Sequence, residues 1–97
     1  MYLSILAGQV SHENWAKLEM TYGMALRHPP EGLSQSFLVH CVEDPGLWEM
    51  FTLWKSKDAF ELAKLNQQID TCFDLFCNLS SIPHRTTFSV TGKYMRI

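Results

Sequence analysis

The spacing of apolar residues along this 97-residue chain switches repeatedly between every second residue and every third or fourth residue. The first spacing is typical of β-strands and the second of amphipathic α-helices. Strand-like spacing covers residues 2–10, 33–43, 47–55 and 85–96. Helix-like spacing fills the two longer intervals, 11–28 and 56–79. The switches therefore predict the order strand, helix, strand, strand, helix, strand.

The first predicted helix has sequence signals at both ends. Ser11 is a good N-cap residue, and Glu13 places a negative charge in the first turn, where the helix dipole favours it. Segment 28–32 contains two prolines and ends the helix, because proline lacks the amide donor. A single apolar stripe joins the two ends and consists of Trp15, Leu18, Tyr22, Ala25 and Leu26.

The second predicted helix is bounded in the same way. Ser56 is its expected N-cap, Asp58 lies in its first turn, and the segment 80–83 ends it with a proline. Apolar residues keep helical spacing over this whole length, so the sequence predicts one continuous helix. Its stripe consists of Phe60, Leu62, Leu65, Ile69, Cys72, Phe73 and Phe76.

The two central strands are predicted to form an antiparallel hairpin, because only the turn-forming segment 43–46 separates them. Both faces of this hairpin carry large apolar side chains. On the first of these strands, Phe37, Val39 and Cys41 are predicted to lie on one face and Leu38, His40 and Val42 on the other. On the second, Trp48, Met50, Thr52 and Trp54 share one face and Leu47, Phe51 and Leu53 the other.

The element order βαββαβ is that of the ferredoxin-like α+β fold, a four-stranded antiparallel sheet with two helices on one face. We expect residues 1–97 to form a single domain of this kind. Two helices cover only one face of such a sheet, so the apolar residues on the other face need a partner. A homodimer that packs sheet against sheet would supply one. It would also compensate for the limited burial of so short a chain, about 60–65% of its unfolded surface.

Composition excludes several function classes. The net charge of −2, with both signs interspersed, argues against nucleic-acid binding. No apolar stretch is long enough to span a membrane, and no signal peptide is visible, so we expect no membrane association and a cytoplasmic location. The three cysteines and four histidines are scattered without metal-ligand spacing. We therefore expect no metal site, and cysteines that are buried as small apolar residues.

Local motifs in this element order resemble the antibiotic biosynthesis monooxygenase domain over nearly the whole chain. The most specific one is the junction from the third strand to the second helix. The matching segments are Glu31-Gly32-Leu33, Glu43-Asp44-Pro45 and Trp54-Lys55-Ser56-Lys57-Asp58-Ala59-Phe60. The resemblance implies a dimeric α+β barrel, formed when two open sheet faces pair, in agreement with the burial argument.

The resemblance also implies a function. Members of the family include cofactor-independent oxygenases of polyketide anthrones or quinols, and haem-degrading enzymes. The haem-degrading branch carries an asparagine on the first strand, and a tryptophan and a histidine on the second helix. Ala7, Ala63 and Phe73 hold those positions here, so haem degradation is disfavoured. A helix histidine that quinol-type members often carry near Ala63 is also absent.

A cofactor-free oxygenase needs a base, a donor or cation for the resulting anion, and an aromatic-lined cavity. His40 is the candidate base, and Tyr22 and Arg85 are candidate donors to an oxyanion. Trp48 and Trp54 are candidates for stacking a planar substrate, and Met50 for lining its pocket. Each residue also has a structural interpretation, as a packing, dimer-contact or surface residue.

Two functional hypotheses follow. The first is a small dimeric monooxygenase that needs no cofactor and acts on an aromatic, polyketide or quinol-type compound. The second is a non-catalytic dimer of the same fold that binds a small apolar ligand or serves in assembly. The first depends mainly on the resemblance, and the missing helix histidine favours the second.

Overall fold

The computed structural model describes residues 1–68, 70–79 and 81–96, and for residues 70–73 it describes the backbone. The elements follow the predicted order. The strands are β1 (Tyr2–Gln9), β2 (Leu33–His40), β3 (Leu47–Trp54) and β4 (His84–Ser89). The helical elements are a 3₁₀ turn, η1 (His12–Asn14), and the helices α1 (Trp15–Ala25), α2 (Lys57–Leu65) and α3 (Asp70–Cys77).

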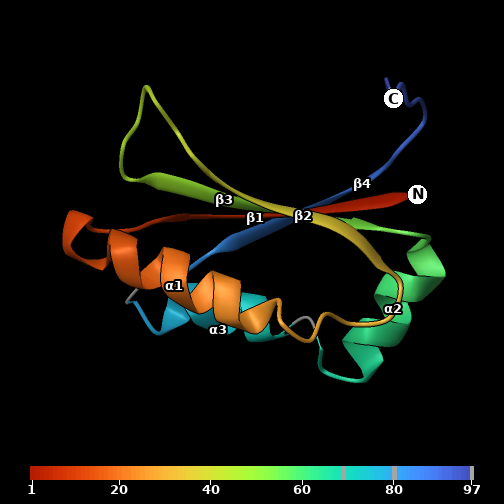
Figure 1. Cartoon of the computed structure of the whole chain (residues 1–97), viewed down its shortest axis with the longest axis horizontal. Coiled ribbons are helices and arrows are strands. Elements are labelled where there is room, and N and C mark those ends of the chain that lie inside the picture. Colours follow the sequence, from red (N-terminus) through yellow and green to blue (C-terminus); the bar gives the residue numbers. More distant parts are fainter. Residues whose placement is uncertain (69, 80, 97) are drawn as a thin grey trace.

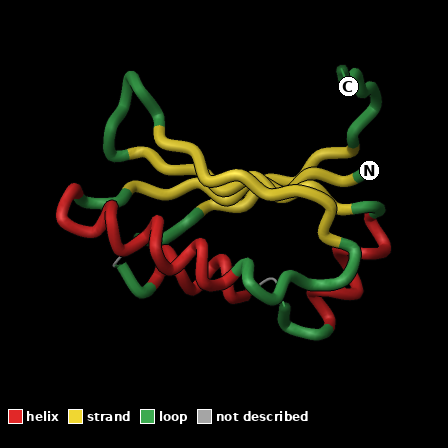
Figure 2. The backbone as a smooth tube through the Cα atoms, viewed as in Figure 1, coloured by secondary structure: helices red, strands yellow, loops and turns green. Residues whose placement is uncertain are grey.

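The strands form one four-stranded sheet in the order β2-β3-β1-β4, with antiparallel pairing between all neighbours. All helices lie on one face of this sheet, and its other face is uncovered (Figures 1 and 2). The predicted ferredoxin-like α+β fold is therefore confirmed.

The alternation of β3 decides which side chains meet the helices. Trp48, Met50, Thr52 and Trp54, which the alternation placed together on one face, are buried toward the helix layer. Phe51 points to the open face, where its Cα partner on β2 is Phe37. Phe37 is 55% exposed, Phe88 46% and Val39 40%, so the open face is as apolar as the sequence indicated.

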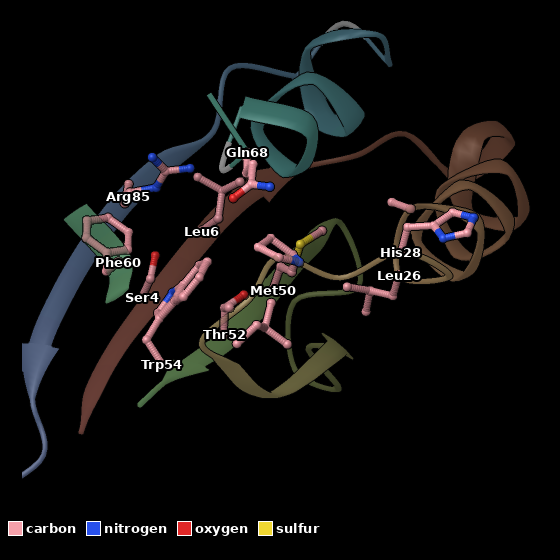
Figure 3. A pocket seen from close by; sticks show the side chains of 13 residues that line it. Ser4, Leu6, Leu26, His28, Met50, Thr52, Trp54, Phe60, Gln68 and Arg85 are labelled. Carbon is pink, nitrogen blue, oxygen red and sulfur yellow. The ribbon is translucent and has the colours of Figure 1, made fainter. Parts of the chain in front are cut away.

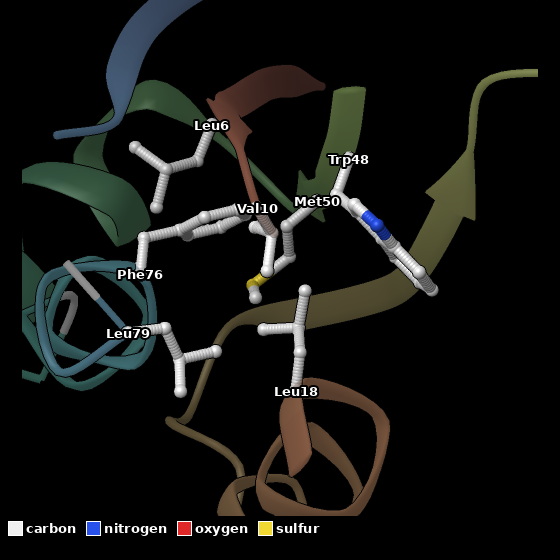
Figure 4. Packing of buried hydrophobic residues seen from close by; sticks show 7 residues of the cluster. All are labelled: Leu6, Val10, Leu18, Trp48, Met50, Phe76 and Leu79. Carbon is white, nitrogen blue, oxygen red and sulfur yellow. The ribbon is translucent and has the colours of Figure 1, made fainter. Parts of the chain in front are cut away.

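The core consists of two separate clusters of buried side chains. The larger one lies between the sheet and helices α1 and α3, which run side by side (Figures 1 and 4). Its members are Leu6, Val10, Leu18, Trp48, Met50, Phe76 and Leu79. The smaller cluster lies beneath α2 and comprises Trp54, Phe60 and Ala63. The helix layer is therefore divided into two parts over one continuous sheet.

The prediction of one continuous second helix is wrong, because α2 ends at Leu65 and α3 begins at Asp70. At this end the amide of Gln68 donates to the carbonyl of Ala63, and the amide of Gln67 to that of Lys64. Gln67 has a φ of 59°, so the end is a Schellman motif with glutamine at the position that glycine usually occupies.

The apolar stripe predicted for that helix is only partly buried. Phe60 and Phe76 are buried, whereas Leu62 and Leu65 are 59% and 79% exposed, so the prediction for these two leucines is wrong. The side chains of Ile69, Cys72 and Phe73 lie outside the described residues. The predicted cap at Ser56 is confirmed, since its Oγ accepts from the amide of Ala59 at 3.0 Å.

The start of α1 and the end of β4 also differ from the sequence prediction. Ser11 precedes a 3₁₀ turn, and its side chain accepts from the side chain of Asn14 instead of capping an amide, so α1 starts later than predicted. Strand β4 ends at Ser89 instead of near residue 96. Ser89 is the Cα partner of Tyr2, the first residue of β1, and the amide of Val90 donates to the carbonyl of Met1.

Candidate functional site

A cavity of about 130 Å3 lies between the sheet and the helix layer, at the junction of the two core clusters (Figure 3). Strands β1, β3 and β4 supply its floor, and the end of α1, the segment that follows it, and α2 supply its walls. Gln68, from the break between α2 and α3, completes the lining. The described lining residues are Ser4, Leu6, Ala25, Leu26, His28, Pro30, Leu33, Met50, Thr52, Trp54, Phe60, Gln68 and Arg85.

The floor carries polar groups in an apolar surrounding. Ser4 and Thr52 are Cα partners on adjacent strands, and both are buried. Trp54, one residue pair further along the same face, is 3% exposed, and its indole Nε1 has no hydrogen-bond partner among the described residues. Its indole lies between Ser4 and Thr52 in Figure 3. A buried N–H with no acceptor is unusual in folded proteins.

The described lining residues include basic side chains and no carboxylate. Arg85 is half-buried on β4, opposite Leu6 of β1. His28 is exposed and follows the end of α1. Because the guanidinium of arginine is always protonated, the described lining contains a fixed positive charge, although the whole chain is acidic. The cavity therefore combines apolar walls with donors and a fixed cation.

The structure divides the residues predicted for the site into two groups. Arg85, Trp54 and Met50 line the cavity together. His40, Trp48 and Tyr22 do not line it.

His40 and Trp48 belong to an aromatic cluster elsewhere on the helix-facing side of the sheet. The imidazole of His40 stacks on the indole of Trp48, and the ring of Trp15 meets His40 edge-on with centroids 4.5 Å apart. Nε2 of His40 donates to the carbonyl of Pro45 in the β2–β3 turn. His40 thus connects α1, β3 and the turn.

Tyr22 is held by a different contact. Its hydroxyl donates to Oγ of Ser36 at 2.6 Å, which ties α1 to β2. This contact and the position outside the lining favour a structural role for Tyr22.

The sequence analysis did not identify four polar residues of the cavity lining as site residues. They are Ser4, His28, Thr52 and Gln68. His28 appeared only as part of a helix-ending segment, and Gln68 as a residue inside a continuous helix. Ser4 and Thr52 are short side chains in apolar strands. For these two, the available signal was a hydroxyl at a position whose alternation pointed inward.

Two of the positions matched to the haem-degrading branch, Ala7 and Ala63, lie in different parts of the fold. Ala7 is on the open face of β1, where its Cα partners are Glu49 and His84. Ala63 belongs to α2 and is buried in the smaller cluster, and the side chain of Phe73 lies outside the described residues.

The expectation of buried cysteines is wrong for Cys77, which is exposed, and Cys41 is half-buried; the side chain of Cys72 is outside the described part of the chain. The described residues contain no cluster of three or more histidine, cysteine, aspartate or glutamate side chains able to hold a metal ion. Within the same residues, no helix has the length and apolar character needed to cross a membrane.

The sequence matches no protein-family model and no curated protein sequence. Solved structures do match along most of the chain. A candidate antibiotic biosynthesis monooxygenase from Deinococcus radiodurans has a TM-score of 0.70 at 19% identity, over 100% of this chain and 98% of that chain. A variant of SnoaB, a cofactor-independent oxygenase from Streptomyces nogalater, has a TM-score of 0.72 at 15% identity, over 95% of both chains.

A third similar structure is that of MhuD, a haem-degrader from Mycobacterium tuberculosis with two haems bound in its active site. It has a TM-score of 0.76 at 17% identity, over 98% of this chain and 100% of that chain. At such identities the likeness concerns the fold, and function has to be argued from the site. The chain thus has the α+β fold shared by the antibiotic biosynthesis monooxygenases, as its sequence motifs predicted.

Proposed function

We propose that this protein is a small monooxygenase that binds an aromatic, quinol-type compound in the cavity and oxygenates it without a cofactor. The observation that carries the proposal is the cavity itself. It is apolar, lies between the helices and the sheet, and brings Arg85 and the indole ring of Trp54 into the same lining. Its likeness in fold to a cofactor-independent oxygenase supports the reaction class.

The reaction requires an electron-rich anion and molecular oxygen. A base removes the proton of a phenolic hydroxyl, and the ring carbon of the resulting anion reacts with O₂. One oxygen atom stays on that carbon as a carbonyl, and the other leaves as water with two hydrogens that the substrate loses. The substrate is oxidised and O₂ is reduced, so no further reductant is needed.

The lining residues provide the groups that this reaction needs. Arg85 would stabilise the phenolate and the charge that develops as O₂ is reduced. His28 is the imidazole that the described lining contains, so we assign it the role of base in place of His40. Leu26, Pro30 and Phe60 would hold the ring and exclude water.

Oxygen uptake with a panel of quinols and anthrones tests the proposal. We expect uptake by the unmodified protein, a large loss in Arg85→Met and His28→Ala, and little change in His40→Ala. An absence of uptake across the panel would contradict the oxygenase proposal. Equal rates for His28→Ala and the unmodified protein would remove His28 from the mechanism.

We also propose that the working form is a homodimer in which two open sheet faces pack together. The support is the apolar surface that this face leaves exposed, which includes Phe37, Val39 and Phe88. Surfaces of this kind on a small soluble domain usually mark an interaction site.

A second candidate function is binding of a small ligand without turnover. The observation that favours it is the exposure of His28, since a base in contact with water is not enclosed in the water-excluded site that oxygenation needs. A ligand that copurifies unchanged, together with an absence of oxygen uptake, would support this candidate.

A further inference from the structure

We infer that the hydroxyls of Ser4 and Thr52 bind a ring hydroxyl of the ligand, so that the cavity selects single-ring phenols over aromatic rings without such a group. This inference deepens the proposed function and rests on it for the location of the site. It assigns these two hydroxyls of the cavity floor to substrate recognition, and it names the chemical group that they recognise.

Ser4 and Thr52 are the middle of a row of hydroxyl side chains that crosses the whole sheet. Its members, in the order of the strands β2, β3, β1 and β4, are the successive Cα partners Ser36, Thr52, Ser4 and Thr87. Directly opposed residues of antiparallel strands point to the same face, so the row lies on the face that the helices cover. The next pair on this face, Leu6 and Met50, is apolar and buried.

The ends and the middle of the row differ in their surroundings. At the ends, Oγ of Ser36 accepts from the hydroxyl of Tyr22 at 2.6 Å, and Thr87 is exposed. In the middle, Ser4 is 7% exposed and Thr52 is 8% exposed. Neither of these two hydroxyls has a hydrogen-bond partner among the described residues. Because buried hydroxyls in folded proteins are nearly always hydrogen-bonded, the pair points to a ligand with a polar group.

Both hydroxyl oxygens can be reached from the cavity. The unpartnered side-chain atoms that protein atoms close off completely include Nε1 of Trp54, and they do not include the oxygens of Ser4 and Thr52. Since both residues line the cavity and are otherwise buried, the accessible surface of these oxygens faces it. The pair is therefore open to a ligand inside the cavity.

A pair of hydroxyls suits a group that both donates and accepts hydrogen bonds. Each hydroxyl of Ser4 and Thr52 donates one hydrogen bond and accepts others, and a phenolic hydroxyl does the same. A ring without this group leaves the pair unsatisfied, which lowers its affinity. A quinol carries two ring hydroxyls, so one can bind the floor while the other stays near the exposed edge of the lining, where His28 lies.

The volume of the cavity sets the size of the ring system. An engineered protein cavity of about 150 Å3 binds one benzene molecule. The cavity here is of similar size, about 130 Å3, and apolar side chains such as Leu6, Met50 and Phe60 surround it. One ring therefore fits beside the hydroxyl pair, and a fused ring system would have to extend beyond the lining.

The test is binding, measured by ¹⁹F NMR and titration calorimetry at neutral pH, where a phenol keeps its proton. The probes are 4-fluorophenol, 1,4-difluorobenzene, which replaces the hydroxyl by fluorine, and 6-fluoro-2-naphthol, which adds a second ring. We expect 4-fluorophenol to bind about tenfold more tightly than each of the others. Equal affinity for 1,4-difluorobenzene, or no binding of 4-fluorophenol, would overturn the recognition of a hydroxyl. Equal affinity for the naphthol would overturn the limit to one ring.

Ser4→Ala and Thr52→Val each remove one hydroxyl with little change of shape. We expect each to weaken the binding of 4-fluorophenol about three- to tenfold and to keep the affinity for 1,4-difluorobenzene. Retained binding of 1,4-difluorobenzene also shows that the cavity is still folded. Thr52→Ser keeps a hydroxyl and should keep most of the affinity for 4-fluorophenol.

Thr87→Val is the matched control, because Thr87 belongs to the same row but is not among the described lining residues. It should leave the affinities for both probes unchanged. An unchanged ratio of the two affinities in Ser4→Ala or in Thr52→Val would overturn the role of the pair. An equal loss for both probes in these variants would also overturn it, because the residues would then serve packing.

The inference and the proposed function fail separately. Binding as expected without oxygen uptake from quinols would remove the oxygenase and keep the hydroxyl site. Oxygen uptake that Ser4→Ala and Thr52→Val leave unchanged would keep the oxygenase and remove the hydroxyl site.

Discussion

The imidazole of His40 lies parallel to the indole of Trp48, with ring centroids 4.1 Å apart and an interplanar angle of 10°. The same imidazole donates to the carbonyl of Pro45, so His40 connects strand β3 to the turn before it. Since a carbonyl only accepts, Nε2 carries the hydrogen. A histidine held by stacking and a backbone hydrogen bond serves the fold, although in sequence it was the candidate base.

We expect His40→Ala to lower the free energy of unfolding by about 1–2 kcal/mol, because both the stacking and the hydrogen bond are lost. His40→Phe should recover part of this loss, since it keeps the stacking. Urea denaturation measures the free energy of unfolding of both variants. The rate of oxygen uptake with quinols should be the same in all three proteins, and a lower rate in His40→Ala alone would return His40 to the site.

Gly8 on β1 allows α3 and the loop after it to approach the sheet closely. A Cβ at this position would lie 2.8 Å from Cδ1 of Phe76 and 2.7 Å from Oγ of Ser81. Phe76 is fully buried, so it has little freedom to move. We expect Gly8→Ala to lower the free energy of unfolding by about 1–3 kcal/mol.

Gly23→Ala is the matched control, because no atom lies within 4 Å of a Cβ there and the residue is inside α1. It should raise the free energy of unfolding by about 0.5–1 kcal/mol, through the better helix propensity of alanine. The two alanine variants should therefore differ in sign in thermal or urea unfolding. A stabilising Gly8→Ala would mean that the packing of Phe76 against β1 is wrong.

The fold could be predicted from the sequence because its signals are periodic and extend over whole segments. The alternation in 47–55 correctly separated the residues that face the helices from those on the open face. The ends of elements depended on single residues and on partners. Strand β4 ends at Ser89, opposite the first residue of β1, whereas the alternation in segment 85–96 continues beyond that point.

The site was harder to predict because it depends on the break between helices α2 and α3. The cavity lies where the helix layer is divided, and the division results from the Schellman motif at Asn66–Gln68. Glycine usually marks that motif, and glutamine occupies its place here, so the apolar periodicity suggested a continuous helix. Without the break, neither Gln68 nor the cavity could be anticipated.

Gln67 should therefore be replaceable by glycine with a gain in stability. Its φ of 59° is in the left-handed region, which costs a residue with a Cβ about 1–2 kcal/mol. Relief of that cost, less the entropy that glycine adds to the unfolded chain, leaves an expected gain of up to about 1 kcal/mol for Gln67→Gly.

The neighbouring Asn66→Gly provides the control, because Asn66 has a φ of −86° and bears no such strain. Glycine there should cost about 0.5–1 kcal/mol. Calorimetric melting of Gln67→Gly and Asn66→Gly measures whether their stabilities change in opposite directions. Destabilisation of the same size in both would show that the left-handed conformation at Gln67 is not what ends α2.

The open sheet face leads to the last prediction, which concerns assembly. Phe37 is 55% exposed and faces away from the helices beside its Cα partner Phe51. If two such faces pack together, a charge at Phe37 would be buried without a partner and would split the dimer. We expect Phe37→Glu to sediment as a monomer at concentrations where the unmodified protein sediments as a dimer.

Met20→Glu adds the same charge on the outside of the helix layer, where Met20 is 60% exposed, and should leave the dimer intact. Because a dimer is stabilised by mass action, the melting temperature of the unmodified protein and of Met20→Glu should rise with concentration, and that of Phe37→Glu should not. An unmodified protein that sediments as a monomer, with a melting temperature independent of concentration, would refute the pairing of the open faces.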